Sequence, residues 1–377
     1  MNKWHKLKLL ALVVCVCIVF ISALLPEENK LQEKFFEKAT EEKVKKLTLV
    51  AVGDNLIHSP IYKSCKTGDG YNFDGLYENV KERISSADIA VINQETIFVD
   101  NPTLFSGYPA FGSPVQVGEA VVKAGFDVVT HATNHTYDKG LRGIEDTLSF
   151  WQKHREISIL GINKDEKDSK SVEILSQNGI DIAMLNFTYG LNGFRLPSGK
   201  EYLVNLLDHS ENTKELLKRA EENGDITIVF VHFGTEYTHV PTSQQKKDVE
   251  FLCENGADII IGTHPHVIEP AEEYVSSNGN KSIVFYSLGN FISNQDSISK
   301  ILGAMAEVTI VKDGEKTFVE SFKMLPTVTH VSNRRYTAYM LEDYTDELAR
   351  VHSRVPNLTV EKLENLFNSV QNKSDAS

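Results

Sequence analysis

The chain has 377 residues, of which 41% are hydrophobic and 24% are charged, the balance of an ordinary globular protein. Its net charge of −13 excludes a broad nucleic-acid-binding surface, because such a surface needs clustered Lys and Arg. We therefore expect no nucleic-acid partner. The length allows one large α/β domain or two smaller ones.

A basic and then apolar segment opens the chain. Lys3, Lys6 and Lys8 precede an uncharged apolar run of 17 residues, Leu9–Leu25, at the short end of what crosses a bilayer. Acidic residues follow the run, and this charge pattern places the N-terminus in the cytoplasm. An uncleaved membrane anchor is predicted, with a cleaved signal peptide as the alternative. Both place the rest of the chain outside the cytoplasm, and the first predicts a single-pass protein of the cell membrane.

A charged segment, residues 27–46, follows and is predicted to form a helix or stalk between the membrane and a folded domain. From residue 47 onward, short β-branched runs alternate with amphipathic segments, which is typical of an α/β fold. The predicted strands are Leu47–Val52, Ile89–Ile92, Val128–Thr130, Ile182–Leu185, Ile226–Val231, Ile259–Ile261 and Ser282–Tyr286. The predicted helices between them are Val115–Ala124, Gly143–His154, Asn212–Asn223 and Ser243–Glu254.

The pattern changes after Phe291. Gly303–Val311 and Lys316–Met324 are typical of a hairpin, because Asp-Gly lies between two β-rich runs. Thr359–Val370 predicts an amphipathic helix before a polar end. We therefore divide the chain into an anchor with a cytoplasmic tip (1–26), a stalk (27–46), a main domain (47–330) and a C-terminal extension with a helix (331–377).

Polar side chains follow nearly every predicted strand. In open α/β sheets, ligands bind beyond the carboxyl ends of the strands, so these side chains are expected to converge on one site. The residues predicted as metal ligands are Asp54, Glu95, Asn134, His232, His264 and His266. Carboxylate, amide and imidazole ligands together suit Mn, Fe, Zn or Co, and no cysteine occurs at these strand ends. The set is large enough for two divalent metal ions that share a carboxylate, and a single ion is the alternative.

The strongest single motif is His264-Pro265-His266. Two histidines at i and i+2 of an extended segment point to the same side, and the proline between them fixes the backbone. His131 also ends a strand, but its alternation places it away from the ligands and predicts a supporting or structural role. Cys65 and Cys253 either pair in an exported domain or stay as free thiols, and the sequence leaves both open.

The motifs resemble those of the CapA family of bacterial capsule synthesis proteins, which assist the production of poly-γ-glutamate capsules. The resemblance covers about Thr48 to Ile292. The motifs that carry it are Gly53-Asp54, Asn93-x-Glu95, Asn134-His135-x-x-Asp138-x-Gly140, His232-x-Gly234-x-Glu236, Gly262-x-His264-Pro265-His266 and Ser287-Leu288-Gly289-Asn290-Phe291. The family is similar in fold to the calcineurin-like metallophosphoesterases. This implies a layered α/β/β/α sandwich with the ligands on its rim.

The chain departs from true metallophosphoesterases in two motifs. Those proteins have Asp-x-His in the first motif, where this chain has Asp54-Asn55-Leu56. His58, four residues beyond Asp54, is an alternative source of the missing imidazole. Their bridging aspartate is also absent, so Glu95 would have to take its place. Phosphatase activity therefore does not carry over directly.

Three hypotheses for the function follow. In a metal-dependent hydrolase of a phosphoester or amide, His135 would protonate the leaving group and Asp138 would orient His135. In a metal-dependent peptide epimerase, His135, Glu236 or another base would move the α-carbon proton. In a non-catalytic component of capsule assembly or export, the site would bind the polymer without turnover. The expected partners are the membrane, an acidic capsule polymer or peptide, and other capsule synthesis membrane proteins.

Overall fold

The computed structural model describes residues 44–372. The predicted anchor and nearly all of the predicted stalk lie outside the described residues. Within 44–372, no helix combines the length and the apolar character needed to cross a membrane. The described residues fall into two compact units, residues 44–45 with Lys312–Lys316, and Lys46–Val311 with the described part of Thr317–Ser377. All six predicted metal ligands belong to the larger unit.

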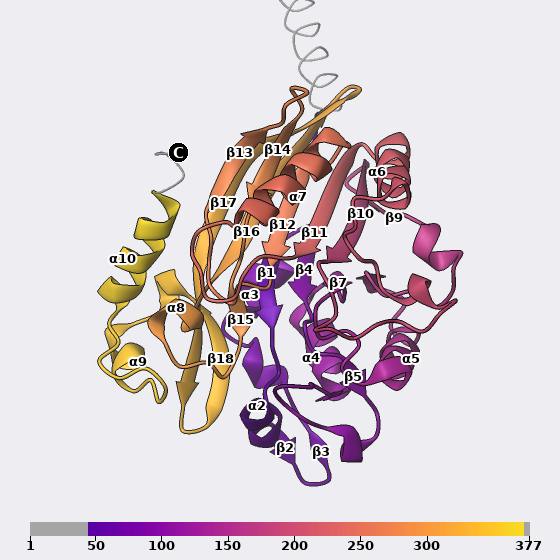
Figure 1. Ribbon diagram of the computed structural model, residues 1–377. Coiled ribbons are helices and arrows are strands. Elements are labelled where there is room, and N and C mark those ends of the chain that lie inside the picture. The colour runs from indigo at the N-terminus through magenta and orange to yellow at the C-terminus, as the bar shows by residue number, and fades with distance from the viewer. Residues whose placement is uncertain (1–43, 373–377) are drawn as a thin grey trace, which may run out of the picture. The chain divides into compact units, whose positions relative to one another are not determined.

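The first sheet has eight strands in the order β18-β17-β16-β1-β4-β7-β8, with β15 paired to β1 (Figure 1). Five of its strands run parallel, namely β1 Val44–Asn55, β4 Ile89–Asn93, β7 Val128–Thr130, β8 Ser158–Leu160 and β15 Asn290–Ile292. The others are β16 Leu302–Asp313, β17 Lys316–Ser332 and β18 Arg335–Met340, of which β17 and β18 pair antiparallel. The parallel strands therefore end at a common edge.

The second sheet has six strands in the order β13-β14-β12-β11-β10-β9. Its parallel strands are β10 Ile180–Thr188, β11 Ile226–His232, β12 Ile259–Thr263 and β14 Lys281–Phe285. The antiparallel edge strands are β9 Glu173–Gln177 and β13 Ala271–Val275. Two small pairs complete the strands, β2 Lys66–Thr67 with β3 Gly70–Tyr71, and β5 Phe98–Val99 with β6 Ser113–Pro114.

The main core lies between the two sheets. In β1, Leu49 and Ala51 pack in the cluster that joins both sheets, whereas Val50 and Val52 pack in the cluster on the opposite face. This alternation follows from strand geometry, because successive side chains point to opposite faces. Burial on both faces explains the nearly continuous apolar runs that predict these strands.

Helices cover the outer face of each sheet. α4 Gln116–Ala124 and α5 Gly140–Trp151 pack on the first sheet, and α6 Glu211–Asn223 and α7 Ser243–Glu254 pack on the second (Figure 1). These are the four α/β/β/α layers that the family resemblance implied. The remaining helices are α2 Ser59–Ser64, α3 Lys81–Ser85, α8 Ile298–Ile301, α9 Asp346–Arg350 and α10 Val360–Gln371. Short 3-10 turns lie at Asp74–Leu76, Pro102–Leu104, Asp168–Lys170, Glu201–Leu203 and Leu341–Asp343.

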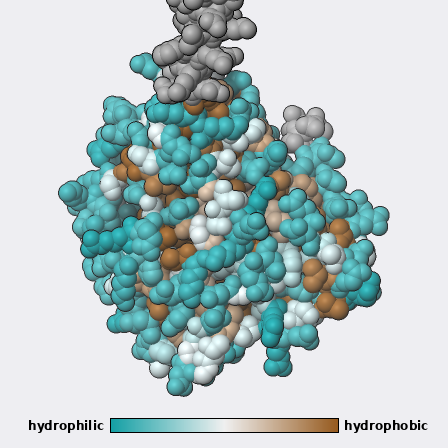
Figure 2. Space-filling model, turned by 180° about the vertical axis from the view of Figure 1, so that it is seen from behind, coloured by the Kyte–Doolittle hydropathy of each residue, from teal (hydrophilic) through white to brown (hydrophobic). Residues whose placement is uncertain are grey.

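The seven predicted strands and five predicted helices are all present, within a few residues of their predicted bounds. The predicted hairpin is also present, but β17 continues to Ser332 and β18 extends the same sheet past residue 330. Cys65 and Cys253 are both free thiols. On the face turned away from the view of Figure 1, hydrophilic residues predominate and hydrophobic residues occupy small separate areas (Figure 2).

Candidate metal centre

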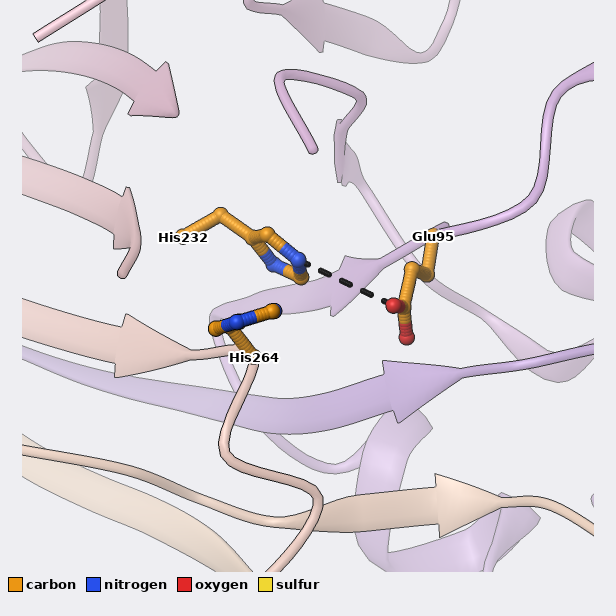
Figure 3. Close-up of side chains that lie close together, drawn as sticks. All are labelled: Glu95, His232 and His264. Atoms are coloured by element: carbon orange, nitrogen blue, oxygen red, sulfur yellow. Dashed lines mark ion pairs between the residues drawn. The ribbon is translucent and has the colours of Figure 1, made fainter. Parts of the chain in front are cut away.

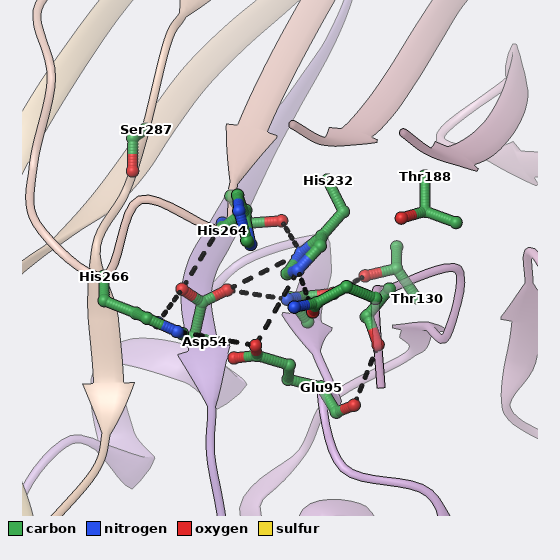
Figure 4. Close-up of polar contacts among 12 residues, drawn as sticks. Asp54, Glu95, Thr130, Thr188, His232, His264, His266 and Ser287 are labelled. Carbon is green, nitrogen blue, oxygen red and sulfur yellow. Dashed lines mark hydrogen bonds and ion pairs between the residues drawn. The ribbon is translucent and has the colours of Figure 1, made fainter. Parts of the chain in front are cut away.

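The six predicted ligands lie together beyond the carboxyl ends of strands from both sheets (Figure 4). Asp54 is the penultimate residue of β1, and Glu95 follows β4 by two residues. His232 ends β11, and the loop after β12 supplies the other two histidines. Parallel strands that end at a common edge bring residues far apart in the sequence to one place.

One group of ligand atoms comes from Glu95, His232 and His264, whose donor atoms all lie within 4.8 Å of one another. His232 Nε2 lies 3.7 Å from Glu95 Oε1 (Figure 3). Asn134 joins this group, since its Oδ1 lies 3.0 Å from His232 Nε2. On the far side of the ring, His232 Nδ1 lies 3.0 Å from Thr263 Oγ1, a contact that turns Nε2 toward the carboxylate.

A second group comes from Asp54, Glu95 and His266, again with donor atoms within 4.8 Å of one another. His266 Nδ1 lies 3.0 Å from Asp54 Oδ2, and its Nε2 lies 3.7 Å from Glu95 Oε1. Asn93 Nδ2 donates to Asp54 Oδ1 at 2.8 Å and fixes that carboxylate. Glu95 therefore belongs to both groups, as the bridging role predicted for it requires.

Buried atoms without partners test whether these residues fit a metal. Both carboxylate oxygens of Glu95 and Nδ1 of His264 are buried and have no hydrogen-bond partner among the described residues. Unsatisfied buried polar groups are costly, and a carboxylate is the costliest kind. Divalent cations held by the two groups would give these atoms partners. The oxygen and nitrogen donors thus fit the predicted class of metals.

The pKa shifts of the buried cluster, with no cation present, also indicate that these residues suit a divalent metal ion. Burial raises the pKa of Glu95, and the nearby Asp54 carboxylate adds to the rise, although His266 opposes it. Burial alone would lower the pKa of His266, but Glu95 and Asp54 outweigh it and raise the pKa to about 9. Burial lowers the pKa of His264 to about 3 and that of His232 well below its usual range. The last two rings are therefore neutral near pH 7, the form that donates to metals.

Of the predicted proton-transfer residues, His135 and Asp138 form a buried pair, whereas Glu236 is exposed. His135 Nδ1 lies 2.7 Å from Asp138 Oδ2, which also accepts a 2.6 Å hydrogen bond from the backbone N–H of Phe111. The expected His135–Asp138 pair is therefore formed beside Asn134. Glu236 is exposed in the loop after β11 and joins neither ligand group.

The backbone around His264 and His266 differs from the extended segment assumed for them. β12 ends at Thr263, and the two histidines have φ angles of 102° and 58°. The premise that they alternate as in a strand is wrong, and they serve different ligand groups. Positive φ is uncommon for residues other than glycine, and such strain persists where the surrounding structure holds it in place, often at functional sites.

One supporting residue, Asn192, was not predicted to belong to the site. Asn192, in the loop after β10, accepts a 3.1 Å hydrogen bond from Asn134 Nδ2 and so directs Asn134 Oδ1 toward His232. Its Nδ2 also lies 3.3 Å from His135 Nδ1. His131, as expected, stays outside both groups, because Trp151 Nε1 donates to its Nε2 at 2.8 Å. Asn192 precedes a glycine, so the sequence suggests only a turn there.

The fold and the site define a layered α/β protein with a candidate metal centre at its strand ends. Residues 48–295, about two thirds of the chain, match the family model described as "Bacterial capsule synthesis protein PGA_cap". The chain belongs to this family, which confirms the resemblance seen in its motifs.

Two relatives carry names from capsule synthesis. The "PGA biosynthesis protein CapA" of Bacillus subtilis (strain 168) is 33% identical over 194 residues, which cover 51% of this chain and 49% of the relative. The "Capsule biosynthesis protein CapA" of Bacillus anthracis is 27% identical over 263 residues, which cover 66% of this chain and 60% of the relative. The chain thus spans only about half to three fifths of the length of these relatives.

The chain also shows a distant likeness to solved structures. A phosphatase from Mycoplasma pneumoniae has 15% identity and a TM-score of 0.46, with 76% of this chain and 94% of that chain covered. The calcineurin-like phosphoesterase YfkN from Bacillus subtilis has 16% identity and a TM-score of 0.43, with 87% and 97% covered. These values support no conclusion about activity.

Proposed function

We propose that this chain is a membrane-anchored, extracytoplasmic hydrolase of poly-γ-glutamate capsule biosynthesis that depends on divalent metal ions. Family membership and the names of the two Bacillus relatives support the capsule process. The basic and apolar N-terminal sequence supports an anchor over residues 1–26 and a stalk over 27–46. A main domain (47–330) with a C-terminal extension (331–377) would then face the site of polymer emergence. The buried Glu95 carboxylate, which belongs to both ligand groups and has no hydrogen-bond partner among the described residues, carries the proposed chemistry.

Two metal ions fit the donor atoms better than one. Glu95, His232, His264 and Asn134 would hold one ion, and Asp54, Glu95 and His266 the other. Such ions supply a Lewis acid that polarises the scissile bond and lowers the pKa of a water molecule. Oxygen and nitrogen donors favour Mn, Fe, Zn or Co at both positions.

His135 is the residue best placed to move a proton. Asp138 holds its Nδ1 at 2.7 Å, so the proton on that nitrogen is fixed and Nε2 is left to exchange protons. The neighbouring Asn134 is a proposed ligand, which sets His135 beside the reacting bond. His135 would therefore protonate the leaving group, with Asp138 as its positioning residue. The substrate would be a phosphoester or an amide within an acidic capsule polymer or peptide, and other capsule synthesis membrane proteins would be partners.

An assay in heavy water separates the three hypotheses. The purified full-length chain, loaded with Mn, Zn or Fe(II), is incubated with poly-γ-glutamate and, separately, with a chromogenic phosphodiester. Polymer length and α-carbon deuterium are measured by mass spectrometry, and phenolate release by absorbance. His135→Gln is the test variant, and Glu211→Gln, an exposed side chain on α6, is the matched control.

The proposal expects hydrolysis of one substrate by the wild-type chain and by Glu211→Gln. It expects a loss of about 100-fold or more in His135→Gln with unchanged metal content. Deuterium at α-carbons without shortening of the chain would instead support the epimerase. Metal binding with no reaction of either substrate would favour the assembly role and contradict the hydrolase.

The location is tested separately. Membrane fractionation of cells that express the full chain should recover it with the membrane, and external protease should cut it. Recovery in the cytosol would contradict the proposed anchor.

A further inference from the structure

The segment after β18 carries an arginine to the edge of the sheet where the candidate metal centre lies. Arg354 Nη2 donates a 3.0 Å hydrogen bond to the carbonyl of Asn294, in the loop after β15. The N–H of Asn294 in turn donates to His58 Nδ1 at 3.3 Å. Arg354 and His58 therefore border the same residue from two sides.

Strand register explains why this point is next to the metal centre. β1 and β15 run parallel, and Asp54 of β1 pairs with Asn290 of β15. His58 and Asn294 each lie four residues beyond that pair, so both leave the sheet at its carboxyl edge. Asn290 Nδ2 also donates to the carbonyl of His266 at 3.0 Å, which ties β15 to a proposed ligand.

Ring contacts connect the same point to the proposed proton donor. The His58 and Phe111 rings meet edge to face with centroids 5.3 Å apart, and Phe111 meets His135 at 4.7 Å. His58 and His135 thus contact one phenyl ring. His58, which borders Asn294 together with Arg354, therefore lies on the His135 side of the metal centre.

The charge at this point differs from that of the chain as a whole. Arg354 is half-buried, its Nε is buried without a hydrogen-bond partner, and it forms no ion pair with a carboxylate within residues 44–372. Burial and, to a lesser extent, the nearby His266, His135 and Arg354 lower the pKa of His58 to about 4, against a hydrogen bond to the Leu56 carbonyl that raises it. An arginine without a counter-charge is unexpected in a chain of net charge −13. A partly desolvated guanidinium destabilises the fold unless an anion pairs with it.

The backbone around Arg354 is fixed in place. His352 Nδ1 accepts hydrogen bonds from the N–H groups of Arg354 and Val355 at 3.2 and 3.0 Å. The N–H of Ser353 donates to the carbonyl of Val331 in β17 at 2.6 Å. The guanidinium is therefore presented by a rigid turn, which lowers the entropy lost when it binds a ligand.

We propose that Arg354 and His58 form an anion subsite that binds a carboxylate or phosphate group of the substrate on the His135 side of the metal centre. A guanidinium matches both anions through paired N–H donors, and among the guanidinium nitrogens of Arg354 only Nη2 donates a hydrogen bond to a described residue. His58 Nδ1 lies 3.1 Å from the Leu56 carbonyl oxygen and 3.3 Å from the Asn294 nitrogen, and in the tautomer that accepts from Asn294 its Nε2–H would add a donor. Arg354 lies outside the matched segment 48–295, so the family match does not account for it. The role in substrate binding rests on the proposed function, whereas anion binding itself does not.

Anion titrations of the full-length chain test the subsite without turnover. The protein is first dialysed against a chelator, so that bound cations do not compete for the anions. Glutarate, a dicarboxylate, and inorganic phosphate are then titrated separately by calorimetry. The variants are Arg354→Met, Arg354→Lys and His58→Gln. The matched control is Arg350→Met, which changes an exposed arginine of α9 that pairs with Glu347.

The subsite predicts saturable binding of at least one probe to the wild-type chain. Arg354→Met should weaken it at least tenfold, Arg354→Lys and His58→Gln by less, and Arg350→Met not at all. The probe that binds more tightly identifies the group as carboxylate or phosphate. Absence of saturable binding to the wild-type chain, or equal binding in Arg354→Met, would overturn the proposal. If Arg354→Met fails to fold by circular dichroism, unchanged binding in both Arg354→Lys and His58→Gln overturns it instead.

The result is separable from that of the hydrolase assay. Anion binding that depends on Arg354, in a chain that hydrolyses nothing, would leave the subsite standing and remove the hydrolase. Hydrolysis without anion binding that depends on Arg354 would support the hydrolase and overturn the subsite.

Discussion

Glu269 is a fully buried carboxyl group whose ionisation should destabilise the fold as the pH rises. It lies in the loop between β12 and β13, with none of its surface exposed. Gln245 Nε2 donates to its Oε2 at 2.6 Å, and its Oε1 has no partner among the described residues. Burial raises its pKa from 4.5 to about 8, because the single bond from Gln245 only partly offsets the loss of water.

The sign and the size of the effect follow from linkage. Below pH 4.5 the folded and unfolded states of Glu269 both hold the proton, so the group has no net effect on stability. Between pH 4.5 and about 8 the unfolded state ionises first, and the folded state loses stability as the pH rises. Each tenfold difference in acid strength corresponds to about 1.4 kcal/mol, so the full effect is at most about 5 kcal/mol. Local rearrangement that hydrates the carboxylate reduces this to an expected value of about 2 to 4 kcal/mol.

Glu269→Gln removes the charge and keeps the shape. Urea unfolding of the metal-free chain at pH 5, 7 and 9 should show the variant gaining stability relative to the wild type as the pH rises. Glu211→Gln, which changes an exposed carboxylate, should follow the wild type at each pH. Parallel curves for Glu269→Gln and the wild type between pH 5 and 9 would refute the reasoning.

Substitutions at three further positions test the fold and the site. A methyl group at Gly53 would lie 1.9 Å from the carbonyl oxygen of Gly289, so Gly53→Ala should separate β1 from β15, cost at least about 2 kcal/mol in urea unfolding and reduce bound metal. Asn192→Ala should weaken the metal site that includes Asn134 by roughly 10- to 100-fold in competition with a chelator, whereas Asn192→Asp, which still accepts from Asn134 Nδ2, should stay near wild type. Leu49→Ala, buried between the sheets, should cost about 3 kcal/mol of unfolding free energy, and a loss below about 1 kcal/mol would contradict that position.

The buried strands and their polar ends were predictable from the sequence. Apolar runs such as Ile226–Val231 identify strands covered on both faces, and parallel strands bring their ends to one edge. The six ligand positions depend only on this rule and on residue type. Short or edge strands such as β8, β9, β13 and β15 were not predicted, because their few residues leave no clear alternation.

Features set by tertiary contacts were out of reach of the sequence. The positive φ angles at His264 and His266 are held by contacts such as the one from His266 Nδ1 to Asp54, 212 residues away. Asn192 is 58 residues from its partner Asn134, and no local pattern marks it. Arg354 and His58 both hydrogen-bond to Asn294, a neighbourhood that neither motif nor periodicity indicates.

The central claim is that the site holds two metal ions, and the number of ions bound per chain tests it most directly. Glu95 belongs to both ligand groups, whereas His264 belongs to one group and His266 to the other. Purified chains are loaded with Mn or Zn, freed of excess metal, and analysed by plasma mass spectrometry. The account predicts two ions in the wild type, one in His264→Ala, one in His266→Ala and none held tightly in Glu95→Gln. A wild type without metal, or Glu95→Gln with the full wild-type content, would contradict it.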